Sequence, residues 1–465
     1  MLDLRQAWDW VSEGRWVTAD PTPGSCVLSG VSTDTRSVGP GQLFVALRGE
    51  RFDAHDFIGQ ALQAGASALL VDRLTPDCTP PLIAVPDTRR ALGEIARGWR
   101  RQFTLPVIGV TGSNGKTTVK EMIAAILAAA HGADHRLATR GNLNNEIGVP
   151  LTLLALGSAH RSAVIEMGMN RPGEIAWLAQ MARPTVALVN NAQREHQEFM
   201  HSVRATAIEN GQAIAALPED GTAIYPGDDE HAPLWASLAA GRRTLCFGWS
   251  EADGAALDVH ASQQADPGGF EMMLCGHRLR VGLSIAGRHN IRNALAAASC
   301  AFAAGIDPEA IVRGLNAFRP APGRLRDLPG LRGARVIDDS YNANPDSVRA
   351  AIDVLVALPA PRVLVLGDMA EVGEQGPQFH EEVGRYAREQ GLDHLLACGP
   401  ACAMAAQAFG PGAEHFVDAP AVLARAGELA GPGATVLVKG SRSMAMERVV
   451  AALTQLTPQG AGQVH

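Results

Sequence analysis

The sequence predicts an α/β protein of three domains, and three observations support this prediction. The chain has 465 residues, which suits about three domains of ordinary size. Short β-branched runs alternate with helical patterns, as in parallel sheets covered by helices. The pattern changes near Pro106, and proline and glycine cluster in FRPAPGR at 318–324. We therefore expect domains at residues 1–104, 105–320 and 321–465.

The N-terminal domain is expected to be of mixed α/β type. VSTDTRSVGPGQLFVAL has the pattern of a loop followed by a strand, and FIGQALQAGASALLV has that of a helix followed by a strand. The proline-containing runs TPDCTPP and AVPD mark loops between such elements.

The central domain is expected to begin with a strand, a tight turn and a helix. PVIGVT is a short β-branched run, TGSNGKTT is the turn, and VKEMIAAILAAA has helical spacing. SAVIEMG and PTVALVNN are typical of buried strands, and NALAAASCAFAAG is typical of a buried helix. This alternation predicts a parallel sheet with helices on both faces.

The C-terminal domain contains three strand-like runs separated by helical patterns. RVLVLGD, DHLLACG and TVLVKGS each end in glycine or a polar residue. This arrangement predicts a smaller, doubly wound, Rossmann-like domain.

The composition is typical of a soluble globular protein. Apolar residues make up 46% of the chain and charged residues 19%. The net charge of −8 argues against a nucleic-acid binder, which needs a basic face, although it leaves room for a local basic pocket.

The sequence carries no pattern typical of export or membrane insertion. Its start, MLDLRQAWDW, has acids and tryptophans where a signal peptide needs a basic start and an apolar core. No uninterrupted apolar run reaches the roughly 18 residues that suggest a membrane span. The seven cysteines are scattered, and the nearest pair, Cys398 and Cys402, lacks the CxxC spacing. We expect reduced cysteines and action in the cytoplasm.

The turn of the central domain has the residues of a phosphate-binding loop, or P-loop. The strict G-x-x-x-x-G-K-[ST] pattern fails because its first glycine would fall at Val110, but a shorter GxxGKT form is present. Its glycines let backbone N–H groups surround phosphate oxygens at the start of a helix. Lys116 can offset phosphate charge, and Thr117 can ligate Mg²⁺. We therefore expect ATP to bind at Gly112, Ser113, Asn114, Gly115, Lys116, Thr117 and Thr118.

The loop alone does not name a reaction. Nucleotide-driven switches, motors, kinases and ligases all use such a loop, and a glycine-rich turn with an incidental lysine is the structural alternative. Other residues must therefore decide the function.

Further polar residues lie at the ends of strands or near helix starts. Glu166 ends a strand-like run, where it could hold Mg²⁺ or be an ordinary strand-end acid. His196 follows the next strand, but a lone histidine is more often a surface or core residue. Asn290 and Asn293 lie near a helix start, where one of them could be a cap. DDSYNANPDS, residues 338–347, could contact a nucleotide or form a turn-rich loop.

Taken together, these residues resemble the Mur ligase family, the ATP-dependent amide-bond formers of peptidoglycan synthesis. TGSNGKTT, NNEIGVP, Glu166, His196, GRHNIRN, PGR and DDSYNANP occur in the family's order and span almost the whole chain. The N-terminal VSTDTRSVGPGQLFVAL and RFDAHDF resemble the family's uridine-nucleotide domain. LGDMAEVG, residues 366–373, is similar to members that add D-alanyl-D-alanine, and the DNPR signature of members that add meso-diaminopimelate is absent.

The resemblance implies an activity and its substrates. The expected enzyme joins D-alanyl-D-alanine to UDP-N-acetylmuramoyl-tripeptide through an acyl phosphate, with ATP and Mg²⁺. We take a monomer as the default state, which the sequence itself does not decide. The alternatives are a ligase that adds the third amino acid, an enzyme similar to folylpolyglutamate synthase, and a nucleotide-dependent switch without ligase activity. The polar cluster at 338–347 argues against the switch, which does not need it.

The resemblance also implies roles for individual residues. The catalytic group is expected to be Lys116, Glu166 and His196, and the metal ligands Thr117, Glu166 and His196. The residues expected to contact the nucleotide, besides the loop, are Asn293, Arg324 and Asp339. The residues expected on the substrate side are Ser32, Asp34, Thr35, Arg36, Asn144, Asn145 and Glu146. The residues expected to help close the site are Lys439, Ser441 and Arg442.

One position departs from the family pattern. Members usually carry a lysine, modified to a carbamate, about fourteen residues after the histidine, and an ungapped count places Asn210 there. Asparagine cannot form a carbamate. Either a second metal has one ligand fewer, or Glu209 or water substitutes, and Glu209 could equally be a solvated helix residue.

Overall fold

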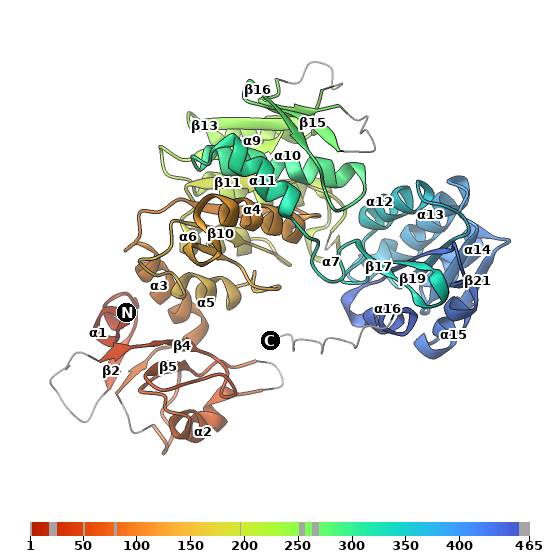
Figure 1. Cartoon of the computed structure of the whole chain (residues 1–465). Coiled ribbons are helices and arrows are strands. Elements are labelled where there is room, and N and C mark those ends of the chain that lie inside the picture. Colours follow the sequence, from red (N-terminus) through yellow and green to blue (C-terminus); the bar gives the residue numbers. More distant parts are fainter. Residues whose placement is uncertain are drawn as a thin grey trace.

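The computed structural model describes residues 2–17, 26–49, 52–78, 81–195, 197–250, 256–262 and 269–454. Three separate main sheets divide these residues into an N-terminal, a central and a C-terminal body (Figure 1). None of the described helices is long and apolar enough to cross a membrane. All seven cysteines are described, and none forms a disulfide.

The N-terminal body is a five-stranded sheet with strand order β2-β7-β6-β5-β4. Strands β4 to β7 are parallel and β2 is antiparallel to β7. The main strands are β2 (Arg15–Val17), β4 (Gly30–Ser32), β5 (Gln42–Val45), β6 (Ala68–Val71) and β7 (Leu82–Ala84). The remaining elements are the pair β1 (Leu2–Asp3) and β3 (Val27–Leu28), with helices α1 (Leu4–Asp9), α2 (Ile58–Gln63) and α3 (Thr88–Arg100).

The central body has a nine-stranded sheet with strand order β16-β15-β14-β13-β12-β11-β8-β10-β9. Its strands are β8 (Val107–Thr111), β9 (Arg136–Ala138), β10 (Ser162–Glu166), β11 (Val186–Val189), β12 (Thr222–Pro226), β13 (Arg243–Trp249), β14 (Val259–Ala261), β15 (Phe270–Leu274) and β16 (His277–Val281). The predicted parallel sheet extends from β9 to β14, but β15 and β16 run antiparallel. Cys275 and Gly276 join them with φ values of 46° and 89°. Two consecutive positive φ values make a tight hairpin turn, which forces antiparallel pairing.

Helices cover both faces of the central sheet, as the alternation predicted. Side chains alternate between the faces, so that Ile108 and Val110 of β8 lie in one apolar core and Val107 in the other. The first face carries α4 (Lys116–His131), α10 (Arg288–Ala303) and α11 (Pro308–Ala317). The second face carries α5 (Gly148–Leu154), α6 (Glu174–Ala182), α8 (Val203–Ala215) and α9 (Ala232–Ala239).

The C-terminal body is a six-stranded, doubly wound sheet with order β17-β18-β22-β19-β20-β21, parallel except for β17. Its strands are β17 (Arg326–Pro329), β18 (Arg335–Asp339), β19 (Arg362–Gly367), β20 (His394–Cys398), β21 (Ala413–Phe416) and β22 (Thr435–Lys439). One face packs against α12 (Pro345–Val356), α13 (Gly376–Glu389) and α14 (Cys402–Phe409), and the other against α15 (Ala419–Leu429) and α16 (Glu447–Leu453).

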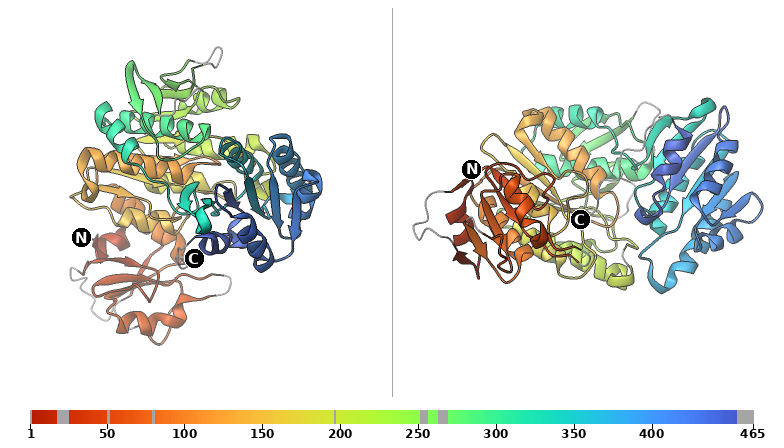
Figure 2. Two further views of the ribbon diagram at one scale, coloured as in Figure 1. Left: turned by 45° about the vertical axis from the view of Figure 1, so that its right-hand side comes forward. Right: turned by 90° about the horizontal axis from the view of Figure 1, so that it is seen from below.

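The two junctions between the bodies differ in chemistry. Helix α3 of the N-terminal body packs on α5 and α6 of the central body, where a Cβ added at Gly93 would lie 2.6 Å from Met181 Sδ. This junction is apolar. The two cores of the C-terminal body, by contrast, consist only of residues from Leu325 onward. The C-terminal body instead meets the central one beside α7 (Gln197–Met200), through the polar contacts described below (Figures 1 and 2).

Candidate active site

A single cavity of about 1050 Å³ connects the three bodies. The N-terminal body contributes Thr33, and the C-terminal body contributes residues that follow β18, β19 and β22. The central body contributes the phosphate loop and the ends of the strands beside it. The predicted site residues that line this cavity are Ser113, Asn114, Gly115, Lys116, Thr117, Asn144, Asn145, Glu146, Glu166, Arg324, Lys439, Ser441 and Arg442.

The two glycines of the loop are required by its close packing. Gly112 has φ +129°, and a Cβ there would lie 2.9 Å from Asn190 Cβ. Gly115 has φ +81°, and a Cβ there would lie 2.6 Å from Asn293 Oδ1. Other residues rarely adopt these backbone angles, and no side chain fits beside the neighbours. The loop therefore keeps a fixed shape against the strand end next to it.

Asparagines hold the loop in place, and the sequence did not reveal their role. Asn190 and Asn191 follow β11 and donate through Nδ2 to Asn114 O, at 2.8 and 2.9 Å. Asn191 Oδ1 accepts from Asn114 N at 2.9 Å. Asn210 Oδ1 accepts from Gly112 N at 3.0 Å. The only sign of this role in the sequence is that Asn190 and Asn191 form a polar pair directly after a strand-like run.

Lys116 lies inside the loop and already has three partners. Its Nζ donates to Gly112 O at 2.5 Å and to Ser113 O at 3.1 Å. It also lies 2.8 Å from Oε1 of the buried Glu195, which the sequence prediction did not single out. The ammonium group is thus held at the mouth of the loop, opposite a carboxylate.

Glu166 is the last residue of β10, which pairs with the strand β8 that leads into the phosphate loop. The Thr117 hydroxyl donates to Glu166 Oε1 at 3.2 Å, and Asn144 Nδ2 donates to the same oxygen at 2.8 Å. Glu166 Oε2 is buried and has no hydrogen-bond partner among the described residues. The predicted pair Thr117 and Glu166 is therefore in contact, and one carboxylate oxygen remains available for a ligand.

The predicted nucleotide residues come from two bodies. Asn293 on α10 accepts at Oδ1 from Asn190 Nδ2 at 3.0 Å and lies next to Gly115. Arg324 Nη2 lies 3.5 Å from Thr117 Oγ1, and its guanidinium stacks 4.1 Å from the centre of the Tyr341 ring. Arg324, at the end of the proline- and glycine-rich run between the central and C-terminal bodies, thus reaches the loop.

Asp339 is tied to the strand beside it rather than exposed to the cavity. Lys439 Nζ donates to Asp339 Oδ2 at 2.7 Å and to Asn342 O at 2.8 Å. Both residues are buried, at the carboxyl ends of the paired strands β18 and β22. Their ion pair fixes the DDSYNANP segment, which carries Tyr341 and Asn344 toward the cavity.

Two contacts join the central and C-terminal bodies next to the loop. Asn344 Nδ2 donates to Asn114 Oδ1 at 2.8 Å, and Asn344 also caps α12. Arg194 donates through Nη2 to Asp346 Oδ1 at 2.6 Å and through Nη1 to Glu382 Oε2 at 2.7 Å. The hydrogen bond with Glu382 is the main cause that raises the pKa of Arg194.

The predicted uridine-nucleotide residues lie next to the cavity but do not line it. Ser32 Oγ donates to Asp34 O at 3.0 Å, and Asp34 accepts from Arg36 Nε at 2.9 Å. Of this segment, Thr33 lines the cavity, whereas Ser32, Asp34, Thr35 and Arg36 are not among the described residues that do so. Asn144, Asn145 and Glu146 do line it, and Glu146 bonds Arg89 of the N-terminal body at 2.7 Å.

Of the residues considered for a second metal, the structure describes Glu209 and Asn210. His196 lies outside the described residues. Glu209 is buried, and its Oε1 accepts from Ile175 N at 2.9 Å, so it caps α6. Neither Glu209 nor Asn210 is among the described residues that line the cavity. Asn210 supports the loop backbone instead of facing a ligand.

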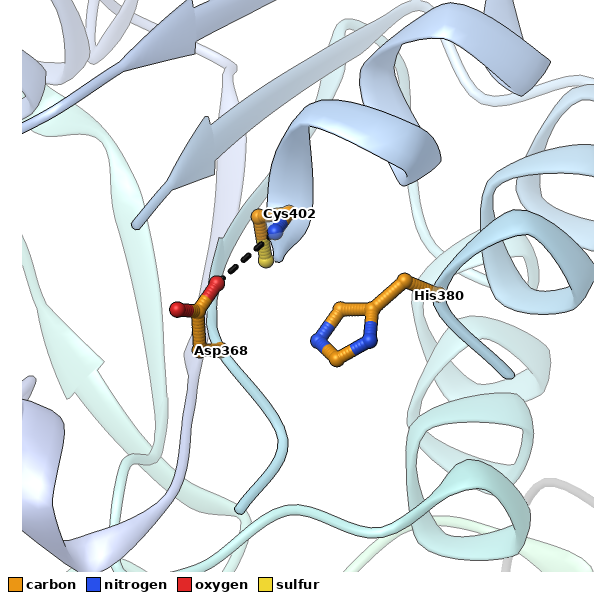
Figure 3. A group of neighbouring side chains, drawn as sticks. All are labelled: Asp368, His380 and Cys402. Atoms are coloured by element: carbon orange, nitrogen blue, oxygen red, sulfur yellow. Dashed lines mark hydrogen bonds between the residues drawn. The ribbon is translucent and has the colours of Figure 1, made fainter. Parts of the chain in front are cut away.

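A separate cluster of Asp368, His380 and Cys402 lies in the C-terminal body (Figure 3). His380 Nδ1 donates to Gly376 O at 2.7 Å, and Nε2 accepts from Met369 N at 3.0 Å. Asp368 Oδ1 accepts from Cys402 N at 2.7 Å, and burial raises the pKa of the Cys402 thiol. Because both ring nitrogens are used by the backbone, this cluster holds the LGDMAEVG loop and is not a metal site.

Three family models match the chain, and together they follow its three bodies. The model described as Mur ligase family, catalytic domain, matches residues 27–100. The Mur ligase middle domain matches 110–301, and the Mur ligase, glutamate ligase domain, matches 323–442.

Full-length relatives and solved structures agree with the family models. The UDP-N-acetylmuramoyl-tripeptide–D-alanyl-D-alanine ligase of Escherichia coli is 44% identical over 432 residues, covering 92% of this chain and 94% of that one. The enzyme of the same name from Bacillus subtilis is 36% identical and covers 93% and 94%. The crystal structure of MurF from Acinetobacter baumannii has a TM-score of 0.88 at 33% identity, covering 97% and 98%. MurF ligase from Thermotoga maritima in complex with ADP has a TM-score of 0.81 at 28% identity, covering 92% and 98%.

Proposed function

This chain belongs to the Mur ligase family, and from that premise we propose how its residues carry out the reaction. The chain joins D-alanyl-D-alanine to UDP-N-acetylmuramoyl-tripeptide with ATP, and so forms the pentapeptide precursor of peptidoglycan, ADP and phosphate. The observation that carries the residue roles is the cavity in which the phosphate loop, Glu166 and the C-terminal residues Lys439, Ser441 and Arg442 meet.

The reaction needs ATP because a carboxylate is a poor electrophile. The peptide carboxylate attacks the γ-phosphate and gives an acyl phosphate and ADP. The amine of D-alanyl-D-alanine then attacks the acyl carbon, and phosphate leaves. The protein needs no covalent nucleophile, since positioning and charge stabilisation serve both steps. Lys116 and the loop N–H groups hold the outer phosphates, and Asn293 and Arg324 hold the rest of the nucleotide.

Thr117 and Glu166 fit a magnesium ion beside the outer phosphates. Glu166 Oε2 is buried without a hydrogen-bond partner among the described residues, an arrangement that is costly unless a ligand satisfies it. A hydroxyl and a carboxylate are hard oxygen donors, which Mg²⁺ prefers. Bound there, Mg²⁺ would neutralise charge on the transferred phosphoryl group. We include His196 in this metal-binding group.

The substrate enters from the N-terminal side of the cavity. Asn144, Asn145 and Glu146 line this side, and the segment from Ser32 to Arg36 lies next to it through Thr33. We propose that this segment binds the uridine-nucleotide end, with the domains divided at 1–104, 105–320 and 321–465. The enzyme acts as a monomer in the cytoplasm.

An assay of ADP release with UDP-N-acetylmuramoyl-tripeptide tests this function directly. The amine substrate is varied among D-alanyl-D-alanine, single amino acids and none. ADP release that requires the dipeptide is the expected result. Release with a single amino acid would identify a ligase that acts at another step, and release without any amine would identify a nucleotide switch.

A further inference from the structure

The third residue of the tripeptide carries the carboxylate that reacts, and this limits where its side chain can lie. Under the proposed function that carboxylate attacks the γ-phosphate at the loop, beside Thr117 and Glu166. The side chain branches from the carbon atom that bears the carboxylate, so it must contact the cavity wall next to Glu166. Residues that follow β10 form this wall, since Gly168, Met169 and Asn170 all line the cavity.

The wall after β10 is held close to Glu166. Gly168 N donates to Asn144 O at 2.8 Å, and a Cβ added at Gly168 would lie 2.9 Å from Asn144 Nδ2. The same Nδ2 atom donates to Glu166 Oε1 at 2.8 Å. The segment that starts at Gly168 therefore belongs to the same hydrogen-bonded unit as Glu166.

Beyond Gly168 the wall carries an apolar strip. Met169, Trp177 and Leu178 line the cavity, and Met169 and Leu178 are buried. The Arg90 guanidinium of the N-terminal body lies 4.8 Å from the centre of the Trp177 ring, which holds the indole in place. Such a strip suits an aliphatic chain, because contact with it removes apolar surface from water.

Glu174 lies on the same face of α6 as this apolar strip. It is three residues before Trp177 and four before Leu178, a spacing that brings side chains together on one face of a helix. Glu174 also lines the cavity. Its Oε2 accepts from Asn170 N at 2.6 Å and from Arg171 N at 3.1 Å, which fixes the carboxylate beside the strip.

Glu174 forms no ion pair with any residue that the structure describes. Two other carboxylates of the cavity are paired, Glu146 with Arg89 and Glu447 with Arg442. The two backbone N–H groups are bound by Oε2 of Glu174, so its Oε1 can accept from a ligand. A half-buried carboxylate without a counter-ion, next to an apolar strip, favours a cationic group on an aliphatic chain.

We propose that Glu174 selects a tripeptide whose third residue ends in an ammonium group on an aliphatic stem. The stem packs on Met169, Trp177 and Leu178, and the ammonium donates to Glu174. Lysine and diaminopimelate both carry such a group. This inference rests on the proposed function, because it places the reacting carboxylate at the loop.

Tripeptides that differ only at the third residue test the inference. ADP release that depends on D-alanyl-D-alanine is measured with lysine, meso-diaminopimelate or norleucine at this position. Norleucine keeps an aliphatic stem but lacks the ammonium group, so its kcat/KM should be roughly tenfold lower or less. The faster of the other two substrates identifies which source of the ammonium the site prefers.

Glu174→Gln removes the charge but keeps an oxygen that can accept from the two backbone N–H groups. It should lower kcat/KM for the ammonium-bearing tripeptides roughly tenfold, mainly through KM, and leave the norleucine tripeptide unchanged. The KM values for ATP and for the dipeptide should stay the same. Glu309→Gln is the matched control, since Glu309 is in the first turn of α11, is not among the described residues that line the cavity, and should change none of these values.

The possible failures can be told apart. Equal kcat/KM values for the lysine, diaminopimelate and norleucine tripeptides in the natural protein would overturn the role of Glu174 and leave the proposed function standing. An equal loss for all three in Glu174→Gln would do the same, because a purely structural defect slows every substrate alike. If no tripeptide supported ADP release that depends on the dipeptide, the proposed function would fall, and this inference with it.

Discussion

Arg194 Nη2 lies 2.6 Å from Asp346 Oδ1, although the two residues are 152 positions apart in the chain. The contact joins the segment after β11 to the first turn of α12, and Glu382 on α13 completes the network. The Arg194 guanidinium also lies 5.2 Å from the centre of the Phe379 ring. The Arg194 side chain therefore contacts both α12 and α13 of the C-terminal body beside the nucleotide cavity.

Replacing Arg194 should loosen this attachment. Arg194→Met keeps an apolar side chain beside Phe379 but removes the charged hydrogen bonds, which should weaken the attachment of the C-terminal body by about 1–3 kcal/mol. We expect a larger radius of gyration by X-ray scattering and weaker ATP binding. Arg385→Met, which removes the exposed ion pair with Glu381 on the same helix, is the control. Identical scattering curves for Arg194→Met and the natural protein would show that the contact does not hold the bodies together.

Lys116→Ala should abolish most of the activity. The variant loses the ammonium that is expected to act on the transferred phosphoryl group, so the turnover number should fall roughly 10²–10³-fold. Phosphate release that depends on D-alanyl-D-alanine is the measurement, with thermal unfolding as the check on folding. Near-normal turnover would refute the role of the loop.

Gly115→Ala should damage the loop through crowding as well as backbone strain. Its φ of +81° is unfavourable for alanine, and the new Cβ would lie 2.6 Å from Asn293 Oδ1. We expect a loss of about 1–3 kcal/mol in stability and weaker ADP binding. Gly132→Ala is the matched control, since it has φ +91° at the other end of α4 and its nearest neighbour atom is 3.4 Å away. Equal losses of stability in the two variants would show that backbone strain alone, without crowding against Asn293, accounts for the effect.

Stability should depend on pH through His289. Burial at the junction of α10 with the C-terminal body lowers the pKa of His289, and the attraction of Asp339 does not offset it. Below about pH 6.5 the unfolded chain therefore binds a proton that the folded chain resists. The free energy of unfolding should fall as the pH decreases from that value through the lowered pKa. His289→Gln should show a flatter dependence of melting temperature on pH, whereas a change at the exposed His277 should not.

The sequence predicted those parts of the protein that depend on local patterns. The loop from Gly112 to Thr118, the strand before it, the helix after it and the strand-end position of Glu166 follow from periodicity and glycine spacing, and the structure confirms their arrangement. The antiparallel pair β15 and β16 was missed because its turn, Cys275–Gly276, is not a common turn sequence.

The remainder of the site depends on contacts between distant segments. Arg194, Glu195 and Asn190 form no motif, and their importance appears only when β11 lies beside the loop strand and α12 lies opposite. Asn210 was recognised only as an exception to a pattern. In the structure it supports the loop backbone at Gly112, a role that no count along the chain could give.

The contrast between the two junctions should appear in the heat capacity of ligand binding. Separating the N-terminal body would expose apolar surface around Trp99 and Met181, and hydration of such surface raises the heat capacity. Separating the C-terminal body exposes mainly the polar groups around Arg194 and Asn344, which contribute little or with the opposite sign. A movement of the C-terminal body on ATP binding should therefore be nearly silent in heat capacity.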